Sequence, residues 1–272
     1  MMKISFSTLG TPYYNIDQII DIAVQNKYQG IEIRAVKGTS DIAGLDEFRG
    51  SGLKDTCNKI KSAGLKVVCV GTSIRFNRAD KADQEKNLEL AKRYIDIAIG
   101  LDCSYIRTFG GPLVATQGYT ESMKWAWEGY NKLCELTKGT NVIPLIETHD
   151  DFSTSARIMD LISGISNGKV GVIWDILHPY RFGEAVENTY NVLKDLIYHV
   201  HIKDSANYSS TGFDITLIGE GKVPISKCIS LLKDNGYEGY LSFEWEKLWH
   251  PEIPEPEIAI PHFASNIVKF IQ

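Results

Sequence analysis

Four side chains with metal-binding chemistry each lie at the end of a short apolar segment. The segments are VIPLIE (142–147), VGVIWD (170–175), LIYHVHIKD (196–204) and YLSFEWE (240–246), and the side chains are Glu147, Asp175, His201 and Glu244. Three carboxylates and one imidazole are a suitable ligand set for a hard or borderline divalent cation. Polar groups that recur at the ends of buried strands are poorly placed for a core. The pattern therefore predicts a shared metal site and a metal-dependent enzyme.

The spacing of these four residues leaves room for one strand–helix unit between successive members. They are 28, 26 and 43 residues apart along the chain. Each interval accommodates a helix, a strand and their loops. In a parallel α/β barrel the C-terminal ends of all strands meet on one face, where catalytic groups gather. Such a fold would bring the four side chains together.

Strand-like and helix-like segments alternate along the whole chain. Apolar segments at 3–9, 30–34, 65–71 and 104–110 precede the four that carry the candidate ligands. Apolar residues at helical spacing predict helices at 16–28, 53–63, 85–101, 120–138, 153–165, 181–195, 225–235 and 257–271. This order predicts an α/β fold, a (β/α)8 barrel, as a single domain over residues 1–272. An open doubly wound sheet is the alternative, but it lacks a glycine-rich phosphate loop after the first strand.

The composition excludes several classes of protein. Of the 272 residues, 43% are hydrophobic and 23% are charged, as in ordinary globular proteins. The formal net charge of −5 argues against nucleic acid or an anionic membrane as the main partner. No apolar stretch approaches the roughly 20 residues that cross a bilayer, and no secretory signal is recognisable. The five cysteines are scattered and contain no CxxC, which predicts buried free thiols and a cytoplasmic location.

Five residues near the strand ends are candidates for binding a substrate: His149, His178, Lys203, Trp245 and Arg75. The two histidines and the lysine closely follow candidate ligands in sequence, and the arginine follows the third strand. The indole could stack on the C–H face of a sugar ring. A helix cap, a solvated loop or a core position is the structural alternative for each of them.

Several other polar residues lie on the predicted strands. Glu246 shares a strand face with Glu244, so alternation alone does not decide which glutamate is the ligand. His199 lies one layer deeper than His201 and is interpreted as a core histidine with a buried partner. The charged residues of the second and fourth strands, including Glu32, Arg34 and Arg107, are interpreted as a buried ion pair or polar layer inside the barrel.

An ordered set of short motifs resembles a known superfamily. The motifs are GIEIR at the second strand, IETH at the fifth, WDILH at the sixth, HVHIKD at the seventh, then IGEGKVP and YEGYLSFEWE. Together they run across nearly the whole chain. The chain thereby resembles the xylose isomerase-like sugar isomerase/epimerase superfamily, which includes ketose 3-epimerases, hydroxypyruvate isomerases and inosose dehydratases.

The resemblance implies roles for particular residues. Glu147, Asp175, His201 and Glu244 would hold the metal, and His178 would contact the substrate. In the epimerase branch, the glutamates matching Glu147 and Glu244 also shuttle protons on opposite faces of the substrate. An arginine after the seventh strand of that branch has no counterpart here, where Asn207 stands at the corresponding distance.

The resemblance also implies cofactor and partners. One divalent cation is expected, with Mn²⁺ favoured over Mg²⁺, Co²⁺ or Zn²⁺. The expected partner is a small-molecule carbohydrate, with no nucleic acid and no membrane. Members of this superfamily commonly form dimers or tetramers through exposed helices, so a homodimer or homotetramer is compatible with it.

The expected activity is that of a metal-dependent sugar isomerase or epimerase. It would remove a proton next to a carbonyl of a keto-sugar or related carbohydrate through a metal-stabilised enediolate. Returning the proton to the opposite face gives epimerisation, and expelling a β-hydroxyl gives dehydration. The alternatives are an inosose or keto-sugar dehydratase with the same site, and a noncatalytic sugar-binding barrel. A zinc endonuclease is disfavoured, because the chain is acidic and has only six histidines.

Overall fold

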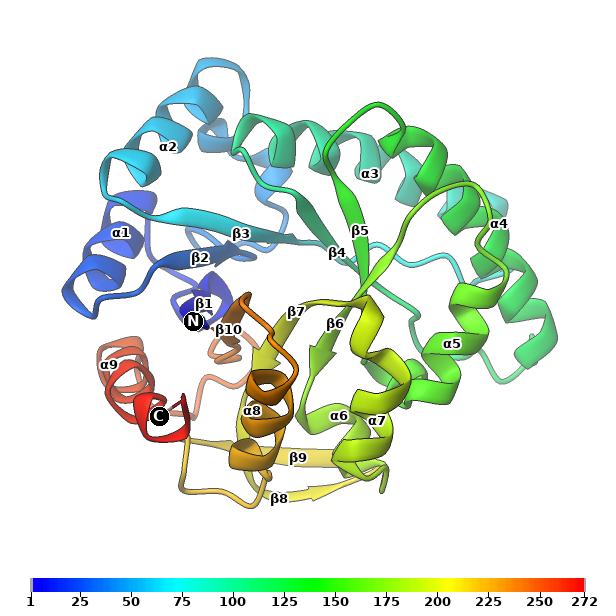
Figure 1. The fold of residues 1–272 in the computed structure, drawn as a ribbon. Helices are drawn as coiled ribbons and strands as arrows, with labels where there is room; N and C mark the ends of the chain where they lie inside the picture. The colour runs from blue at the N-terminus through cyan, green and yellow to red at the C-terminus, as the bar shows by residue number, and fades with distance from the viewer. Residues whose placement is uncertain (1, 272) are drawn as a thin grey trace.

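The computed structural model describes residues 2–271 and contains a closed barrel of eight parallel strands (Figure 1). Around the barrel the strands follow the order β1-β10-β7-β6-β5-β4-β3-β2. Their bounds are β1 (Lys3–Ser7), β2 (Gly30–Ile33), β3 (Lys66–Gly71), β4 (Tyr105–Phe109), β5 (Ile143–Glu147), β6 (Gly171–Asp175), β7 (Ile197–Ile202) and β10 (Tyr240–Phe243). The predicted (β/α)8 barrel is confirmed.

Helices form a ring outside the barrel (Figure 1). They are α1 (Ile16–Gln25), α2 (Gly50–Ser62), α3 (Lys81–Gly100), α4 (Tyr119–Thr137), α5 (Ser155–Ser163), α6 (Leu177–Arg181), α7 (Val186–Leu193), α8 (Ile225–Asp234), α9 (Pro256–Asn266) and α10 (Val268–Ile271). Short 3-10 turns lie at η1 (Thr8–Gly10), η2 (Ile42–Gly44), η3 (Asp46–Phe48), η4 (Asp150–Phe152) and η5 (Lys194–Leu196). Within residues 2–271, no helix is both long and apolar enough to cross a membrane.

Local sequence explains where several of these elements begin and end. Asn15 and Gln18 form a reciprocal capping box at the start of α1, with two hydrogen bonds of 3.0 Å. Gly64 and Gly236 follow α2 and α8 at φ values of 76° and 74°, the left-handed conformation that glycine adopts without strain. All residues of β2 and β6 are buried, as expected for strands covered by helices outside and by side chains inside.

Strand register brings the four candidate ligands to one end of the barrel. Glu147 and Asp175 are the last residues of β5 and β6, and His201 lies beside Asp175 in the pairing of β6 with β7. Glu244 follows β10 directly, and its backbone N–H donates to the carbonyl of Ile202 on β7. All four therefore lie at the C-terminal ends of neighbouring strands.

Three predicted elements differ from the structure. The helix predicted at 181–195 begins later, as α7 at Val186, because the chain turns after α6 at Gly183, which adopts a φ of 84°. The eighth strand ends at Phe243, so YLSFEWE leaves the sheet before its glutamates. The seventh ends at Ile202, and a separate antiparallel hairpin follows, β8 (Asp204–Ser209) with β9 (Gly212–Thr216). The first strand of this hairpin is rich in polar residues, and the short apolar alternation of Phe213 and Ile215 in β9 was not recognised in the sequence.

Candidate active site and metal centre

The side chains of Glu147, Asp175, His201 and Glu244 meet at the C-terminal end of the barrel. Each offers one ligand atom, and these four atoms lie within 4.8 Å of one another. All four residues are at most 3% exposed to solvent. Burying three carboxylates together is unfavourable unless cations compensate their charge. The positively charged groups near this quartet therefore determine the charge state of its carboxylates.

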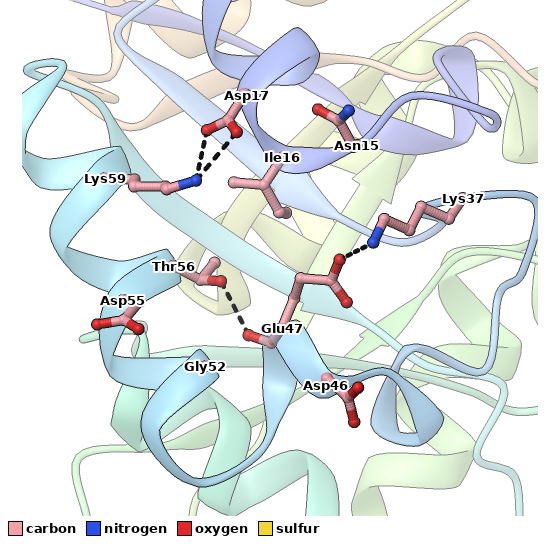
Figure 2. A pocket seen from close by; sticks show the side chains of 10 residues that line it. All are labelled: Asn15, Ile16, Asp17, Lys37, Asp46, Glu47, Gly52, Asp55, Thr56 and Lys59. Carbon is pink, nitrogen blue, oxygen red and sulfur yellow. Dashed lines mark hydrogen bonds and ion pairs between the residues drawn. The ribbon is translucent and has the colours of Figure 1, made fainter.

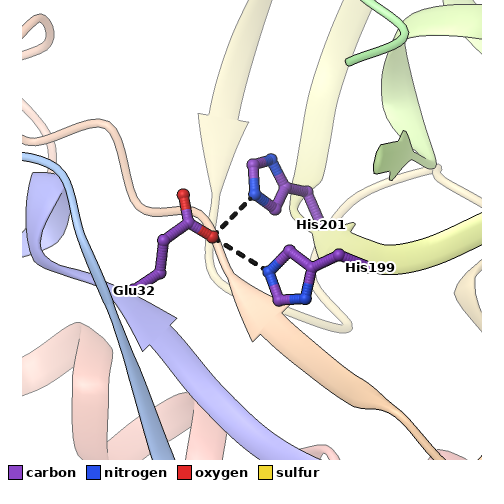
Figure 3. Close-up of side chains that lie close together, drawn as sticks. All are labelled: Glu32, His199 and His201. Atoms are coloured by element: carbon purple, nitrogen blue, oxygen red, sulfur yellow. Dashed lines mark hydrogen bonds and ion pairs between the residues drawn. The ribbon is translucent and has the colours of Figure 1, made fainter. Parts of the chain in front are cut away.

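The imidazole of His201 lies between two groups of carboxylates. Its Nδ1 is 2.9 Å from Oε1 of Glu147 and 3.3 Å from Oε1 of Glu244. Its Nε2 is 2.9 Å from Oε2 of Glu32, which belongs to β2 (Figure 3). The three carboxylates raise the pKa of His201 well above its usual value, although burial alone would lower it. Nδ1 is therefore the nitrogen that points toward the other three candidate ligands.

Arg107 of β4 joins the two glutamates of the quartet. Its Nη1 donates a 3.0 Å hydrogen bond to Oε1 of Glu244 and lies 3.2 Å from Oε2 of Glu147. Burial and the charge of Glu244 raise the pKa of Glu147, but Arg107 and His201 outweigh them, and the net pKa is lowered. The sequence interpretation of a buried polar layer was right about this arginine, but its contact with both glutamates is a long-range feature that strand patterning does not reveal.

Lys203 provides a second buried cation. Its Nζ lies 2.9 Å from Oδ2 of Asp175, 2.6 Å from Oε2 of Glu244 and 2.5 Å from Oε1 of Glu246. The lysine is fully buried and forms part of the charged layer itself. Burial raises the pKa of Asp175 to about 6, in spite of the opposing charge of Lys203. Glu246 contacts only Lys203 in this layer, whereas Glu244 is the glutamate that belongs to the quartet.

The donor set fits a divalent cation. Within the described part of the chain, Oε2 of Glu147 and Oδ2 of Asp175 are buried and accept no hydrogen bond, and each has only a charge contact, with Arg107 at 3.2 Å and with Lys203 at 2.9 Å. Buried carboxylate oxygens without a hydrogen bond are costly, and a divalent cation bound between them would ligate both. Three carboxylates with one imidazole nitrogen suit Mn²⁺, Mg²⁺, Co²⁺ or Zn²⁺. These four residues can therefore hold a metal ion.

A cavity of 380 Å³ opens above the quartet and includes Glu244 in its wall. Much of the remaining lining comes from segments that follow the barrel strands: the imidazoles of His149 and His178, Arg181, Phe213 and Trp249. The imidazole centroids of the two histidines are 4.4 Å apart in an edge-to-face contact. Aromatic faces beside hydrogen-bonding groups are the usual surroundings of a small carbohydrate-sized ligand.

Two of the predicted substrate residues line this cavity. His178 lies in α6, where its backbone N–H and that of Leu177 donate to Oδ1 of Asp175 at 3.3 and 2.9 Å. Its Nδ1 accepts a 3.0 Å hydrogen bond from Nε of Arg181. His149 follows β5, with Nδ1 3.0 Å from Oδ1 of Asp150. Arg181 was not predicted, although its place one helical turn after His178 is a usable signal.

The other three predicted substrate residues lie elsewhere. Trp245 is fully buried, stacks on Phe243 and donates to the carbonyl of Pro254, and it is not among the residues that line the cavity. Trp249, which is 52% exposed, is the indole that lines the cavity. The chain leaves the sheet at Phe243, so strand alternation does not predict which of these indoles faces the cavity. Arg75 lies beside Gly111 and close enough to Asp150 to lower the pKa of that carboxyl, but it does not line the cavity, and Lys203 lies beneath the cavity.

The β8–β9 hairpin covers one side of the cavity. Its first residue, Asp204, accepts hydrogen bonds from the backbone N–H groups of Gly219, Gly221 and Val223 at 2.9 to 3.2 Å. IGEGKVP is therefore the loop that fixes the base of the hairpin. Phe213, on β9, lies 5.5 Å from the ring of His178 and 5.4 Å from the guanidinium carbon of Arg181.

Two other cavities among residues 2–271 differ in chemistry from the one above the quartet. One of 400 Å³ lies outside the barrel between α1 and α2 (Figure 2). Its lysines are already neutralised, since Lys59 pairs with Asp17 at 2.8 Å and Lys37 pairs with Glu47. Another, of 1090 Å³, opens at the opposite end of the barrel and is lined largely by apolar groups such as Met2 and Ile4. The cavity above the quartet is the candidate active site.

Comparison with known proteins decides the family. The family model of the xylose isomerase-like TIM barrel matches residues 20–262. The chain belongs to this family. It is 23% identical over 257 residues to fructoselysine 3-epimerase of Shigella flexneri, covering 89% of this chain and 90% of that protein. It is also 23% identical over 213 residues to 3-dehydroshikimate dehydratase of Bacillus anthracis, covering 76% and 74%.

Among solved structures, the chain is similar to the IolI protein with a bound zinc atom. The TM-score is 0.81, with 18% identity, over 99% of this chain and 98% of the other. This likeness shows the shared fold. The family thus includes epimerases, isomerases and a dehydratase, so family membership alone leaves the reaction type open.

Proposed function

We propose that this protein is a divalent-metal-dependent sugar isomerase or epimerase acting on a keto-sugar or related carbohydrate. The observation that carries the proposal is the buried quartet of Glu147, Asp175, His201 and Glu244 beneath a carbohydrate-sized cavity. Mn²⁺ is the cation we propose, held by one oxygen of each carboxylate and by Nδ1 of His201. When bound, it would polarise the substrate carbonyl and stabilise the negative charge that develops on proton removal.

In this proposal the two glutamates transfer the proton. They come from β5 and from the end of β10, which are not neighbours in the barrel, so they approach the cavity from different sides. One glutamate enters the step as a carboxylate and removes the proton next to the carbonyl, and the other enters it as the carboxylic acid and returns its own proton from the opposite face. Positioned acid–base groups of this kind contribute about 10²–10⁴-fold to a rate. Arg107 contacts both side chains and fixes their spacing.

The loop residues bind and orient the substrate in this proposal. His178 is held by Arg181 and by the α6 backbone, so its Nε2 can contact a substrate hydroxyl. His149 and Trp249 provide a hydrogen-bonding group and an apolar face on the cavity wall. Phe213 excludes water from the reacting carbon, which strengthens the electrostatic interactions at the site.

Dehydration of a keto-sugar or inosose is a second candidate. It is favoured by Glu246, which lines the cavity and contacts the buried ammonium of Lys203. This carboxyl group lies where it could assist the departure of a hydroxyl. The similarity of the chain to a 3-dehydroshikimate dehydratase also supports dehydration. A noncatalytic sugar-binding barrel is less well supported, because none of the four ligands has been lost.

Proton exchange in D₂O tests the proposal. Purified, Mn²⁺-loaded protein is incubated with ketoses, keto-glycosides and inososes, and deuterium incorporation is followed by NMR. Exchange next to the carbonyl should occur and should be abolished by EDTA or by Glu244→Gln. A new conjugated absorbance would favour dehydration instead. Binding of these sugars without exchange or elimination, in protein with bound metal, would favour the noncatalytic alternative.

A further inference from the structure

The side of His201 that faces away from the quartet is occupied by a second buried cluster (Figure 3). Oε2 of Glu32 lies 2.9 Å from Nε2 of His201 and 3.0 Å from Nε2 of His199. The hydroxyl of Ser242 donates to the same oxygen at 3.3 Å. Three donors from β7 and β10 thus converge on one carboxylate oxygen of β2.

This cluster is separated from the substrate cavity. Glu32 and Ser242 are fully buried, and His199 is 1% exposed. His199 lies two residues before His201 on β7, one layer deeper in the barrel. None of these three residues lines the cavity, whereas His201 contacts the quartet, so a role of Glu32 in the reaction would act through His201.

We propose that Glu32 is the positioning residue of the metal centre. It accepts the Nε2–H of His201 and thereby leaves Nδ1 unprotonated, facing the cation. His199, in turn, fixes the orientation of Glu32. This inference rests on the proposed metal site.

The chemistry of imidazole gives the physical reason. A neutral imidazole carries one proton on its two nitrogens, and the hydrogen bond made by one nitrogen determines which of them is free to bind metal. A carboxylate behind a ligating histidine fixes the tautomer and the ring orientation and increases ligand basicity. Loss of such a partner typically weakens metal binding by about 10–100-fold.

The contacts of Glu32 favour this role over a general contribution to core stability. All three donors are on Oε2, while Oε1 has no hydrogen-bond partner among the described residues. A carboxylate placed only to satisfy buried donors would use both oxygens. Here one oxygen of Glu32 faces Nε2 of His201, and the contact with His199 holds that oxygen in place.

The primary test is the tautomer of His201 in the full-length protein with bound Zn²⁺, which is diamagnetic. Long-range ¹H–¹⁵N NMR of ¹⁵N-histidine-labelled protein should show Nδ1 bound to metal and Nε2 protonated. This measurement needs no variant. Metal ligation through Nε2, or an unprotonated Nε2, would overturn the proposal while leaving the metal site itself intact. Absence of any metal binding would remove the proposed function as well.

Variants provide the second test, with the dissociation constant of Mn²⁺ as the readout. Glu32→Gln and Glu32→Ala should each weaken binding by about 10–100-fold, with the larger loss in Glu32→Ala. Ser242→Ala is the matched control, because it removes the longest contact to the same oxygen and should change the constant less than threefold. A purely structural role for Glu32 predicts lower stability but an unchanged dissociation constant in the folded variant.

Metal stoichiometry separates one remaining possibility. Glu32, His199 and His201 also lie close enough together to hold a cation of their own. One Mn²⁺ per chain, lost on Asp175→Asn, agrees with a positioning role for Glu32. A second Mn²⁺ that survives Asp175→Asn and disappears in Glu32→Ala would make Glu32 a ligand and would overturn the proposal.

Discussion

Arg107 donates a 3.0 Å hydrogen bond to Glu244 from the opposite part of the barrel. The same guanidinium nitrogen lies 3.2 Å from Glu147. The two glutamates therefore share one cation, and the charge of each depends on it. Because all three side chains are buried, their interaction is screened little by solvent. This shared cation explains how two carboxylates remain ionised side by side.

Replacing Arg107 should therefore affect stability and metal dependence together. In Arg107→Met the two glutamates lose their partner, and we expect the metal-free protein to lose about 3–5 kcal/mol of unfolding free energy. Saturating Mn²⁺ should recover more stability in the variant than in the natural protein, because it replaces the missing charge. Urea unfolding with and without Mn²⁺ measures both quantities. Arg49→Met, which removes a hydrogen bond to the carbonyl of Ala43, is the control. Equal losses in the two variants would contradict the account.

Asp175 gives a prediction about pH. Burial raises its folded-state pKa from 3.8 to about 6, so the folded metal-free protein binds more protons than the unfolded chain between those values. The charged Asp175 therefore lowers the unfolding free energy of the metal-free protein above about pH 6, and this loss disappears as the pH falls toward 4. Asp175→Asn should stabilise the metal-free protein at pH 7 by about 1–3 kcal/mol and abolish tight Mn²⁺ binding. Unfolding curves at pH 5 and 7 test this, and a gain that is the same at both values would contradict it.

Lys203 and a bound cation compete for the same oxygens. The ammonium lies within 3 Å of both Asp175 and Glu244, so removing it should increase affinity for Mn²⁺. We expect Lys203→Met to bind Mn²⁺ at least as tightly as the natural protein, while turnover falls by about 10²-fold. Lys222→Met, which affects an exposed contact with Asn207, is the control for loss of a lysine charge. Markedly weaker Mn²⁺ binding in Lys203→Met would show that the lysine supports the metal site.

Phe213 should influence substrate binding without affecting the metal. Its ring lies 5.5 Å from that of His178 and 5.6 Å from Nζ of Lys203, above the quartet. We expect Phe213→Ala to raise KM by about tenfold, in line with about 1.4 kcal/mol for an aromatic contact. The dissociation constant of Mn²⁺ should stay the same. Tyr208→Ala removes the other large aromatic of the hairpin, which packs on Tyr180, and should leave KM nearly unchanged.

The sequence was most informative where function and strand position coincide. Glu147, Asp175 and His201 end buried apolar runs, and that local pattern was enough to predict both the barrel and their meeting point. His199 was also correctly interpreted as a core histidine with a buried partner, which proves to be Glu32. These successes depend on periodicity and burial, which are properties of short segments.

The parts that sequence did not predict are long-range or irregular. The contact of Arg107 with Glu244 joins residues 137 positions apart, and no local signal specifies it. The β8–β9 hairpin and Phe213 were missed because this short antiparallel pair interrupts the strand–helix alternation. Trp245 was misplaced because the chain leaves the sheet at Phe243, where strand alternation no longer determines direction reliably.

X-ray diffraction from crystals grown with Mn²⁺, recorded at a wavelength where manganese scatters anomalously, tests the central claim most directly. The account predicts one strong anomalous peak at the C-terminal end of the barrel. The peak should lie about 2.0–2.4 Å from oxygens of Glu147, Asp175 and Glu244 and from Nδ1 of His201. A peak ligated by other residues, or none despite Mn²⁺ in excess, would contradict it.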